Sequence, residues 1–251
     1  MKIKSSPSLL LLLPLSLLSF CGGNVEGAIS LTSGIAYTQN FDVLASSGTS
    51  STMPIDWVFT ESGVNSDILY ATGIGSITTG DTYSFGGGSS SERALGGLQS
   101  GSLIPTFGAS FTNNIGVGVI DLHISYTGEQ WRLGTADANI DRLDFQYSTD
   151  AISLTSGTWV DFNSLDFSSP YNGVAGSLDG NAAGNKTSIT AMIPNLNIAN
   201  GATFWIRWND FNVTSFDDGL AVDDFSVTAV PEPTAVLLGA IGLLGLLRRR
   251  R

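Results

Sequence analysis

The sequence predicts an all-β fold, a two-sheet antiparallel β-sandwich of the jelly-roll type, and three observations support this prediction. Apolar and polar residues alternate in short stretches, as in 119–126, where Ile120, Leu122 and Ile124 share one face. Turn-forming residues separate such stretches about every 8–12 positions. Between the two chain ends the sequence shows no amphipathic helix. Many short strands with frequent turns are typical of sandwiches.

Seven stretches carry the alternation clearly and are predicted to be strands. Leu143 and Phe145, for example, alternate with Asp144 and Gln146, so that one face of the strand is apolar and the other polar. The predicted strands are 57–61, 109–112, 119–126, 143–148, 188–193, 204–209 and 220–227.

The first 27 residues are predicted to be a secretory signal peptide. Lys2 and Lys4 give it a positive start, and residues 9–20 form its apolar segment. Gly27 is a small residue suited to the position before the cleavage site. An alternative lipoprotein signal would use Cys21, but a bulky phenylalanine precedes that cysteine where a small residue is needed.

The last 22 residues, 230–251, combine three features of a sorting signal. Pro231, Glu232 and Pro233 form a turn that ends any preceding strand. The uncharged stretch 234–247 follows, and as a short apolar helix it would span only ~21 Å, less than the ~30 Å hydrocarbon core of a membrane. Four arginines that stop translocation from the cytoplasmic side close the chain: Arg248, Arg249, Arg250 and Arg251.

This tail resembles the PEP-CTERM sorting domain of Gram-negative bacteria over all 22 residues. The resemblance implies that an exosortase, a membrane transpeptidase, recognises the Pro-Glu-Pro element and removes the tail. Until then the tail anchors the protein in the inner membrane. Afterwards the protein reaches the cell surface or an extracellular polysaccharide matrix. An ordinary C-terminal membrane anchor is the alternative. A sandwich domain, 28–229, is thus expected between a signal peptide, 1–27, and a sorting segment, 230–251.

The segment between the two signals is strongly acidic and contains no cysteine. Five basic residues stand against 20 acidic ones, a formal charge of −15. Such a charge disfavours nucleic acid and anionic lipid as partners, and it is compatible with divalent cations and neutral glycans. Solubility alone would also explain the acidity. Without disulfides, the stability of this exported domain depends on its core or on a bound metal.

Catalytic groups are scarce in the sequence. The single histidine, His123, is predicted on the polar face of a strand, and there is no nucleophile elbow, dinucleotide fingerprint or zinc motif. Carboxylates are abundant, and a pair of them could hydrolyse a glycosidic bond. Nothing in the sequence selects two of the 20 acids for that role. The domain is therefore predicted not to be an enzyme.

Asp223 is the acidic residue most clearly predicted to point inward. The alternation within 220–227 puts it on one face with Phe225 and Val227. A buried carboxylate is costly unless it is paired or bound to a metal. Calcium would suit it, because calcium takes about 6–8 oxygen ligands. A salt bridge with Arg207, or simple exposure of the carboxylate, is the alternative.

A further resemblance concerns the body of the chain. The stretches 40–42, 54–57 and 221–225 resemble MAM- and lectin-like jelly rolls, in which the first and last strands pair. The resemblance implies that acids on those strands hold a structural calcium ion. The residues that would do so here are Asp42, Asp223 and Asp224.

Three other stretches, 126–132, 178–182 and 205–208, are similar to accessory modules found beside bacterial extracellular nucleases. This similarity implies a module without catalysis of its own. Trp131 and Trp205 lie in these stretches, each next to an arginine on a predicted polar face, and are candidates for stacking on sugar rings. Packing in the core is the alternative for both tryptophans.

Together these observations predict an exported protein of the cell surface or extracellular matrix. It is expected to be a non-enzymatic adhesion or glycan-associated module, with an exosortase and an extracellular polysaccharide as partners. One alternative is a secreted glycoside hydrolase that uses carboxylates. The other is the binding module of a larger degradative system.

Overall fold

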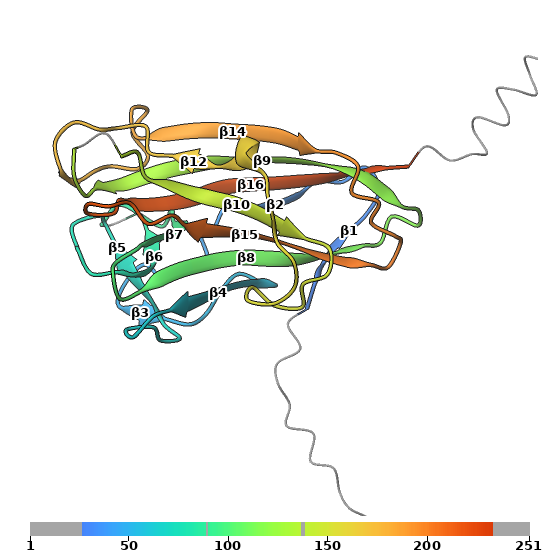
Figure 1. Cartoon of the computed structure of the whole chain (residues 1–251), viewed down its shortest axis with the longest axis horizontal. Helices are drawn as coiled ribbons and strands as arrows, with labels where there is room; N and C mark the ends of the chain where they lie inside the picture. The colour runs from blue at the N-terminus through green and yellow to red at the C-terminus, as the bar shows by residue number, and fades with distance from the viewer. Residues whose placement is uncertain (1–26, 89, 137–138, 233–251) are drawn as a thin grey trace, which may run out of the picture.

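The computed structural model describes residues 27–232 except 89 and 137–138 (Figure 1). Most of the predicted signal peptide, the predicted apolar helix and Arg248 to Arg251 lie outside the described residues. The described chain forms two β-sheets and one short 3-10 turn, η1 (Asn163–Leu165). The predicted all-β, two-sheet sandwich is therefore confirmed. None of the described residues belongs to a helix that is long and apolar enough to cross a membrane.

Sheet A contains seven of the described strands in the order β1-β8-β15-β10-β11, with β4 also beside β8 and β12 also beside β10. Its long strands contain four of the stretches predicted from the alternation. The strands are β1 (Ile29–Leu31), β4 (Trp57–Ser62), β8 (Ile104–Asn113), β10 (Arg142–Ser148), β11 (Val160–Asp161), β12 (Phe167–Ser168) and β15 (Thr203–Asp210).

Sheet B contains nine of the described strands in the order β13-β9-β16-β7-β6-β5-β3, with β14 also beside β9 and β2 also beside β16. The other three predicted strands lie here, in β9, β14 and β16. The strands are β2 (Tyr37–Gln39), β3 (Thr49–Ser50), β5 (Tyr70–Gly73), β6 (Asp81–Phe85), β7 (Ala94–Leu98), β9 (Val119–Leu133), β13 (Gly176–Ser177), β14 (Lys186–Ile193) and β16 (Gly219–Pro231).

The sheets are mixed, so the prediction of a purely antiparallel sandwich is wrong in two places. β5 pairs with β6 in parallel, and β1 pairs with β8 in parallel. β4 pairs antiparallel with residues 104–109 of β8 and does not reach residues 111–113. β1 pairs with residues 111–113 and runs parallel to β8, in the direction opposite to β4. Each parallel pair contains a strand of only three or four residues, too short for alternation to reveal it.

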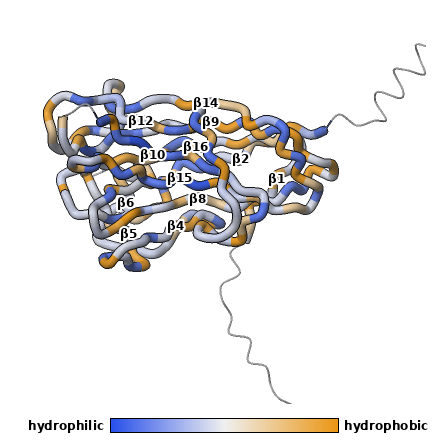
Figure 2. Tube along the Cα trace, in the orientation of Figure 1, coloured by the Kyte–Doolittle hydropathy of each residue, from blue (hydrophilic) through white to orange (hydrophobic). Residues whose placement is uncertain are grey.

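The core lies between the sheets and is rich in aromatic rings. Trp208 stacks on Phe107 at 5.8 Å between ring centroids and meets Phe225 edge-on at the same distance. Trp57 also stacks on Trp208, at 6.2 Å. Figure 2 shows hydrophobic and hydrophilic residues interspersed along the strands of both sheets. Each large apolar side chain buried in this way contributes about 1.5–3 kcal/mol, which supplies the stability that disulfides cannot provide here.

A β-bulge in the last strand decides where Asp223 points. The register between β16 and β9 shifts between Asp223 and Ser226, and Asp224 adopts a left-handed backbone with φ of 47°. Val222 and Phe225 both lie in the main core, so Asp223 must point to the opposite face of sheet B. The prediction that Asp223 shares a face with Phe225 is therefore wrong, because the bulge changes the alternation.

Candidate functional site

A cleft lies at the end of the sandwich where β16 begins. Its volume is about 570 Å³. It forms between the turn after β7, the end of β9 and the loop 211–218 that leads into β16. We call it the loop-end cleft. Its lining residues are Thr78, Leu98, Gln99, Ser100, Gly101, Arg132, Gly134, Ser215, Phe216 and Asp217.

The lining combines one exposed aromatic ring with several polar groups. Phe216 is 78% exposed, whereas Gln99 is 6% exposed. The Oε1 atom of Gln99 is buried and accepts no hydrogen bond from the described residues. Arg132 donates from Nη1 to the carbonyl of Gly75 at 3.1 Å, and Asp217 accepts a hydrogen bond from the Val213 N–H at 3.1 Å. A ring beside a few convergent polar groups can bind a sugar.

Four aspartates gather at this end of the sandwich, and we call them the loop-end acid layer: Asp217 lines the cleft, and Asp141, Asp210 and Asp218 lie near it. Asp218 accepts hydrogen bonds from the Gly134 N–H (2.7 Å), Gln130 Nε2 (2.8 Å) and Ser169 Oγ (2.5 Å). The Asp141 carboxylate in turn accepts the N–H of Asp218 at 2.7 Å. These donors fix the loop 211–218 against the end of the sheets.

Burial changes the protonation of this layer. Burial raises the pKa of Asp141 to about 7, although the Asp218 N–H opposes the shift. The pKa of Asp210 is raised well above its usual value, first by burial and then by the charges of Asp141 and Asp217. Neither carboxylate oxygen of Asp210 accepts a hydrogen bond by distance and angle from the described residues. Sequence reasoning missed Asp210, although its position two residues after Trp208 on β15 indicates an inward side chain.

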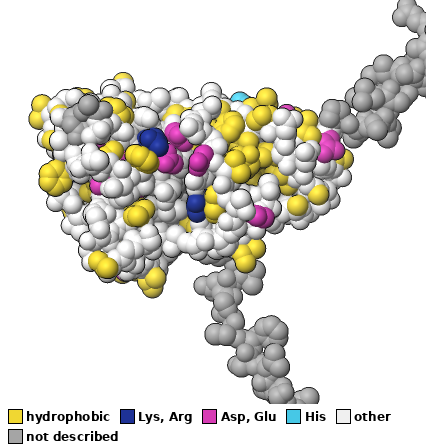
Figure 3. Space-filling view, in the orientation of Figure 1, with side chains coloured by type: hydrophobic (Ala, Val, Ile, Leu, Met, Phe, Trp, Pro, Cys, Tyr) yellow, Lys and Arg dark blue, Asp and Glu magenta, His cyan; other side chains and the backbone are white. Residues whose placement is uncertain are grey.

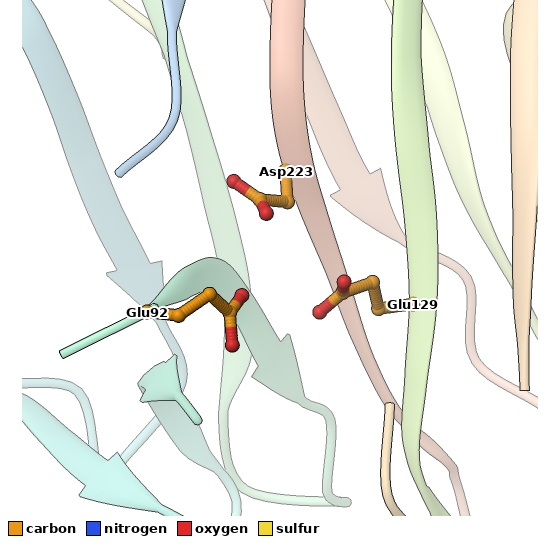
Figure 4. Close-up of side chains that lie close together, drawn as sticks. All are labelled: Glu92, Glu129 and Asp223. Atoms are coloured by element: carbon orange, nitrogen blue, oxygen red, sulfur yellow. The ribbon is translucent and has the colours of Figure 1, made fainter. Parts of the chain in front are cut away.

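A second group of acids, Glu92, Glu129 and Asp223, lies along the strands of sheet B, and we call it the strand acid cluster. One carboxylate oxygen from each residue lies within 4.8 Å of the other two. Figure 4 shows the three carboxylates turned toward a common space, one from β9, one from β16 and one from the segment leading into β7. Glu129 is 1% exposed and Asp223 is 6% exposed.

The structure brings one of the three predicted calcium ligands, Asp223, into this cluster. Asp42 is exposed in a turn after β2, where its carboxylate accepts hydrogen bonds from Asn40 Nδ2 (2.6 Å) and the Arg93 N–H (3.1 Å). Asp224 is exposed in the bulge. The strand predicted over 40–42 is wrong, because Phe41 is left-handed with φ of 55°. Glu92 and Glu129 were not predicted, since they meet only through the pairing of distant strands.

The alternative partner of Asp223 is also wrong. Arg207 lies on β15 in sheet A, where its Nε donates to Gln146 Oε1 at 2.7 Å. Its guanidinium carbon lies 3.9 Å from the centroid of the Trp159 ring. Asp223 belongs to sheet B, and its carboxylate forms no salt bridge with a described residue.

Trp131 and Trp205 are both buried, so neither can stack on a sugar from the surface. Trp131, 2% exposed, stacks on Phe85 at 6.0 Å and donates from Nε1 to Glu129 Oε2 at 2.9 Å. Gly180 lies against the same indole ring. Trp205, 4% exposed, packs with Ala151 and Leu154. Each tryptophan lies on an outer sheet face, as predicted, but residues from other segments cover both faces.

The sorting motif begins directly at the end of the sandwich. β16 continues to Pro231, which pairs with Val119, and the Glu232 N–H donates to the Gly118 carbonyl at 2.9 Å. Pro233 and the rest of the tail lie outside the described residues.

His123 is exposed on β9, as the sequence predicted. Figure 3 shows that charged side chains are sparse on the face of the molecule drawn there, with hydrophobic ones between them.

Several solved structures are similar to the chain at low identity, among them the following three. The CBM22-1 xylan-binding domain from Paenibacillus barcinonensis Xyn10C is 11% identical, with 78% of this chain and 95% of that chain covered and a TM-score of 0.35. TmCBM61 in complex with beta-1,4-galactotriose is 8% identical, with 68% of this chain and 88% of that chain covered and a TM-score of 0.33. The bacteriophage CBA120 tailspike protein 4 enzymatically active domain is 7% identical, with 70% of this chain and 19% of that chain covered and a TM-score of 0.36. The chain spans about a fifth of the tailspike domain. No curated protein matches the chain.

A family model described as the PEP-CTERM protein-sorting motif matches residues 229–251. The match includes the Pro-Glu-Pro element and the four terminal arginines. The chain therefore carries a PEP-CTERM sorting motif at its C-terminus, which implies an exported protein that is held transiently at the membrane and processed by an exosortase.

Proposed function

We propose that the chain is a protein of the cell surface or extracellular matrix that binds polysaccharide in the loop-end cleft without breaking it down. The sorting motif supports delivery to the outside of the cell. The cleft supports binding, because it offers a ring, a guanidinium, an amide and a carboxylate around one space. With a charge of −15 on the domain, a neutral polysaccharide is the favoured ligand over an anionic one.

The observation that carries this proposal is the exposure of Phe216 beside the polar side chains that line the same cleft. Most of the Phe216 ring faces solvent, and a ring of this kind binds the apolar face of a sugar. Gln99, Arg132 and Asp217 line the same cleft and offer an amide, a guanidinium and a carboxylate for hydrogen bonds with sugar hydroxyls.

The position of the cleft also suits a surface protein. β16 has 13 residues and runs from the cleft at Gly219 to the sorting motif at Pro231 (Figure 1). At ~3.3 Å per residue the strand separates the two by about 40 Å. Before the tail is removed, the cleft is thus held at the end of the domain away from the membrane attachment.

Affinity electrophoresis or calorimetry with a panel of neutral and acidic polysaccharides tests the proposal. Phe216→Ala is expected to weaken binding about 10-fold or more, since stacking and burial of a ring contribute over 1 kcal/mol. Phe211→Ala is the matched control, because Phe211 is also exposed but stacks with Arg142 away from the cleft lining. Equal losses in both variants, or no binding across the panel, would overturn the proposal.

Hydrolysis of a polysaccharide is the second candidate function, favoured by the acids near the cleft. Asp217 lines the cleft, and burial raises its pKa, as a general acid requires. Release of reducing ends that is abolished by Asp217→Asn, but kept by the exposed-site variant Asp67→Asn, would establish this alternative. Binding without release of reducing ends would exclude it for the polysaccharide tested.

A further inference from the structure

We propose that Glu92, Glu129 and Asp223 bind one calcium ion that joins β9, β16 and the segment leading into β7. The proposal does not depend on polysaccharide binding, because the strand acid cluster shares no residue with the lining of the loop-end cleft. Two observations carry it: two oxygens of the cluster are bare, and none of its three acids forms a salt bridge with a described residue.

The oxygens of the cluster are only partly satisfied by the protein. Glu129 Oε2 accepts from Trp131 Nε1, and Glu92 Oε2 accepts from Asn181 Nδ2. Glu92 Oε1 and Asp223 Oδ1 are buried and accept no hydrogen bond from the described residues. Asp223 is 94% removed from solvent and turns its carboxylate toward the other two acids (Figure 4). A buried acceptor without a donor requires a partner that the protein does not supply, such as an ion, a water molecule or a proton.

The basic side chains near the cluster attract its acids from a distance but form no salt bridge with them among the described residues. Arg93 follows Glu92 in the chain, but its guanidinium is buried and donates to the Ser84 hydroxyl and carbonyl. Lys186 lies opposite Glu129 across β14 and β9, where it is exposed and forms no salt bridge with a described residue. Burial accordingly raises the pKa of Asp223 to about 8 and that of Glu129 to about 7. Three acids that share one site require either protons or a cation.

The donor set favours calcium over other divalent ions. All three side chains offer oxygen, the mature body has no cysteine, and His123 lies exposed elsewhere on β9. Zinc prefers nitrogen and sulfur ligands, whereas calcium takes about 6–8 oxygens in irregular geometry. Magnesium demands a near-ideal octahedron, which carboxylates already bonded to Trp131 and Asn181 are poorly placed to supply.

A calcium ion here would replace the cross-links that the domain lacks. The three carboxylates come from positions 92, 129 and 223, so one ion would connect distant parts of the chain within sheet B. Because the ion binds only the folded state, it raises the melting temperature. With calcium at 100 times its Kd, the expected rise for a domain of this size is about 5–10 °C.

The first test compares thermal unfolding of the full chain in EDTA, CaCl2 and MgCl2. Wild type is expected to melt higher in calcium than in EDTA, with little response to magnesium. Glu129→Gln and Asp223→Asn remove charge with little change of shape, so they are expected to raise the melting temperature in EDTA and lose the calcium response. Asp67→Asn, at an exposed acid, is the control that keeps the response. A wild-type melting temperature that is the same in EDTA and calcium overturns the proposal.

Terbium luminescence gives a second readout that does not depend on stability. The Trp131 indole nitrogen lies 2.9 Å from Glu129 Oε2, so excitation of tryptophan is expected to sensitise terbium bound in the cluster. Calcium should quench this emission by competition, and Glu129→Gln should abolish it. Emission that persists undiminished in Glu129→Gln would place the ion elsewhere and overturn the assignment.

Discussion

Asp141 and Asp218 of the loop-end acid layer differ from the acids of the strand acid cluster in what satisfies their oxygens, whereas Asp210 of the same layer resembles the cluster in having bare oxygens. Asp218 accepts three hydrogen bonds from backbone and side-chain donors, and Asp141 accepts two backbone N–H groups. In the strand cluster, Asp223 Oδ1 and Glu92 Oε1 have no such donor among the described residues. Asp218 and Asp141 are therefore stabilised by the fold itself, whereas the strand cluster requires something from solution.

This difference follows from the backbone around each group. Loops such as 211–218 present N–H groups that no ladder uses, and carboxylates at loop ends accept them. On the face of a sheet the backbone N–H groups are already paired in the ladder. A carboxylate that points outward from β9 or β16 therefore meets mainly other side chains, such as the Trp131 indole beside Glu129. Few backbone donors remain for it apart from the Asp224 N–H at the bulge.

The largest predicted effect tests whether the loop-end layer is structural. Asp218→Ala leaves Gln130 Nε2, the Gly134 N–H and Ser169 Oγ without this acceptor, so the free energy of unfolding should fall by about 3 kcal/mol or more. Urea unfolding at neutral pH in EDTA measures it. The matched variant Asp223→Ala removes an acid with a bare oxygen and should cost less than 1 kcal/mol. Equal losses in the two variants would contradict the comparison.

A smaller effect is expected on the pH dependence of stability. Burial raises the folded-state pKa values of Asp223, Glu129 and Asp141 to about 8, 7 and 7, above the ordinary values of 3.8, 4.5 and 3.8 for these side chains. At a pH between the ordinary pKa of each group and its raised folded-state pKa, the folded state holds protons that the unfolded state releases. The free energy of unfolding therefore falls as pH rises from about 4 to 8. Calcium should remove the part of this slope that comes from Asp223 and Glu129.

Denaturant unfolding at a series of pH values, in EDTA and in calcium, measures the two slopes. The pH dependence of the free energy of unfolding that remains in calcium is expected to come from Asp141 and other buried acids, including Asp210 and Asp81. The double variant Glu129→Gln, Asp223→Asn should show that remaining slope even in EDTA. Stability that rises with pH over this range in EDTA would show that the cluster is not protonated in the folded state.

Much of the fold could be predicted because long strands repeat their alternation. All seven predicted strands lie within longer ones, and faces such as that of Leu143 and Phe145 are correct. Strands of two to five residues carry too little periodicity to be recognised, which is why β3, β5 and β13 were missed. A single left-handed residue at Asp224 was enough to reverse the predicted face of Asp223.

The candidate sites were less predictable, because they depend on contacts between distant segments. Trp131 lies on a polar-looking strand face, yet Phe85 and Gly180 bury it from far away in the chain. Glu92 precedes a Gly-rich strand with little alternation, and nothing local indicates that it meets Asp223. The sorting motif is the opposite case, since its information is contained in consecutive residues.

The smallest predicted effect separates the strand acid cluster from the two acids that sequence resemblance selected beside it. Asp224→Asn keeps a residue that tolerates the left-handed backbone, and Asp42→Asn retains a side-chain oxygen at a turn, so each should change stability by less than about 0.5 kcal/mol. Neither variant should alter the calcium-induced shift in melting temperature measured by thermal unfolding. Because both residues are exposed, a lost calcium response in either one would mean that the ion sits at the surface bulge, and the buried oxygens of Glu92 and Asp223 would then need protons instead.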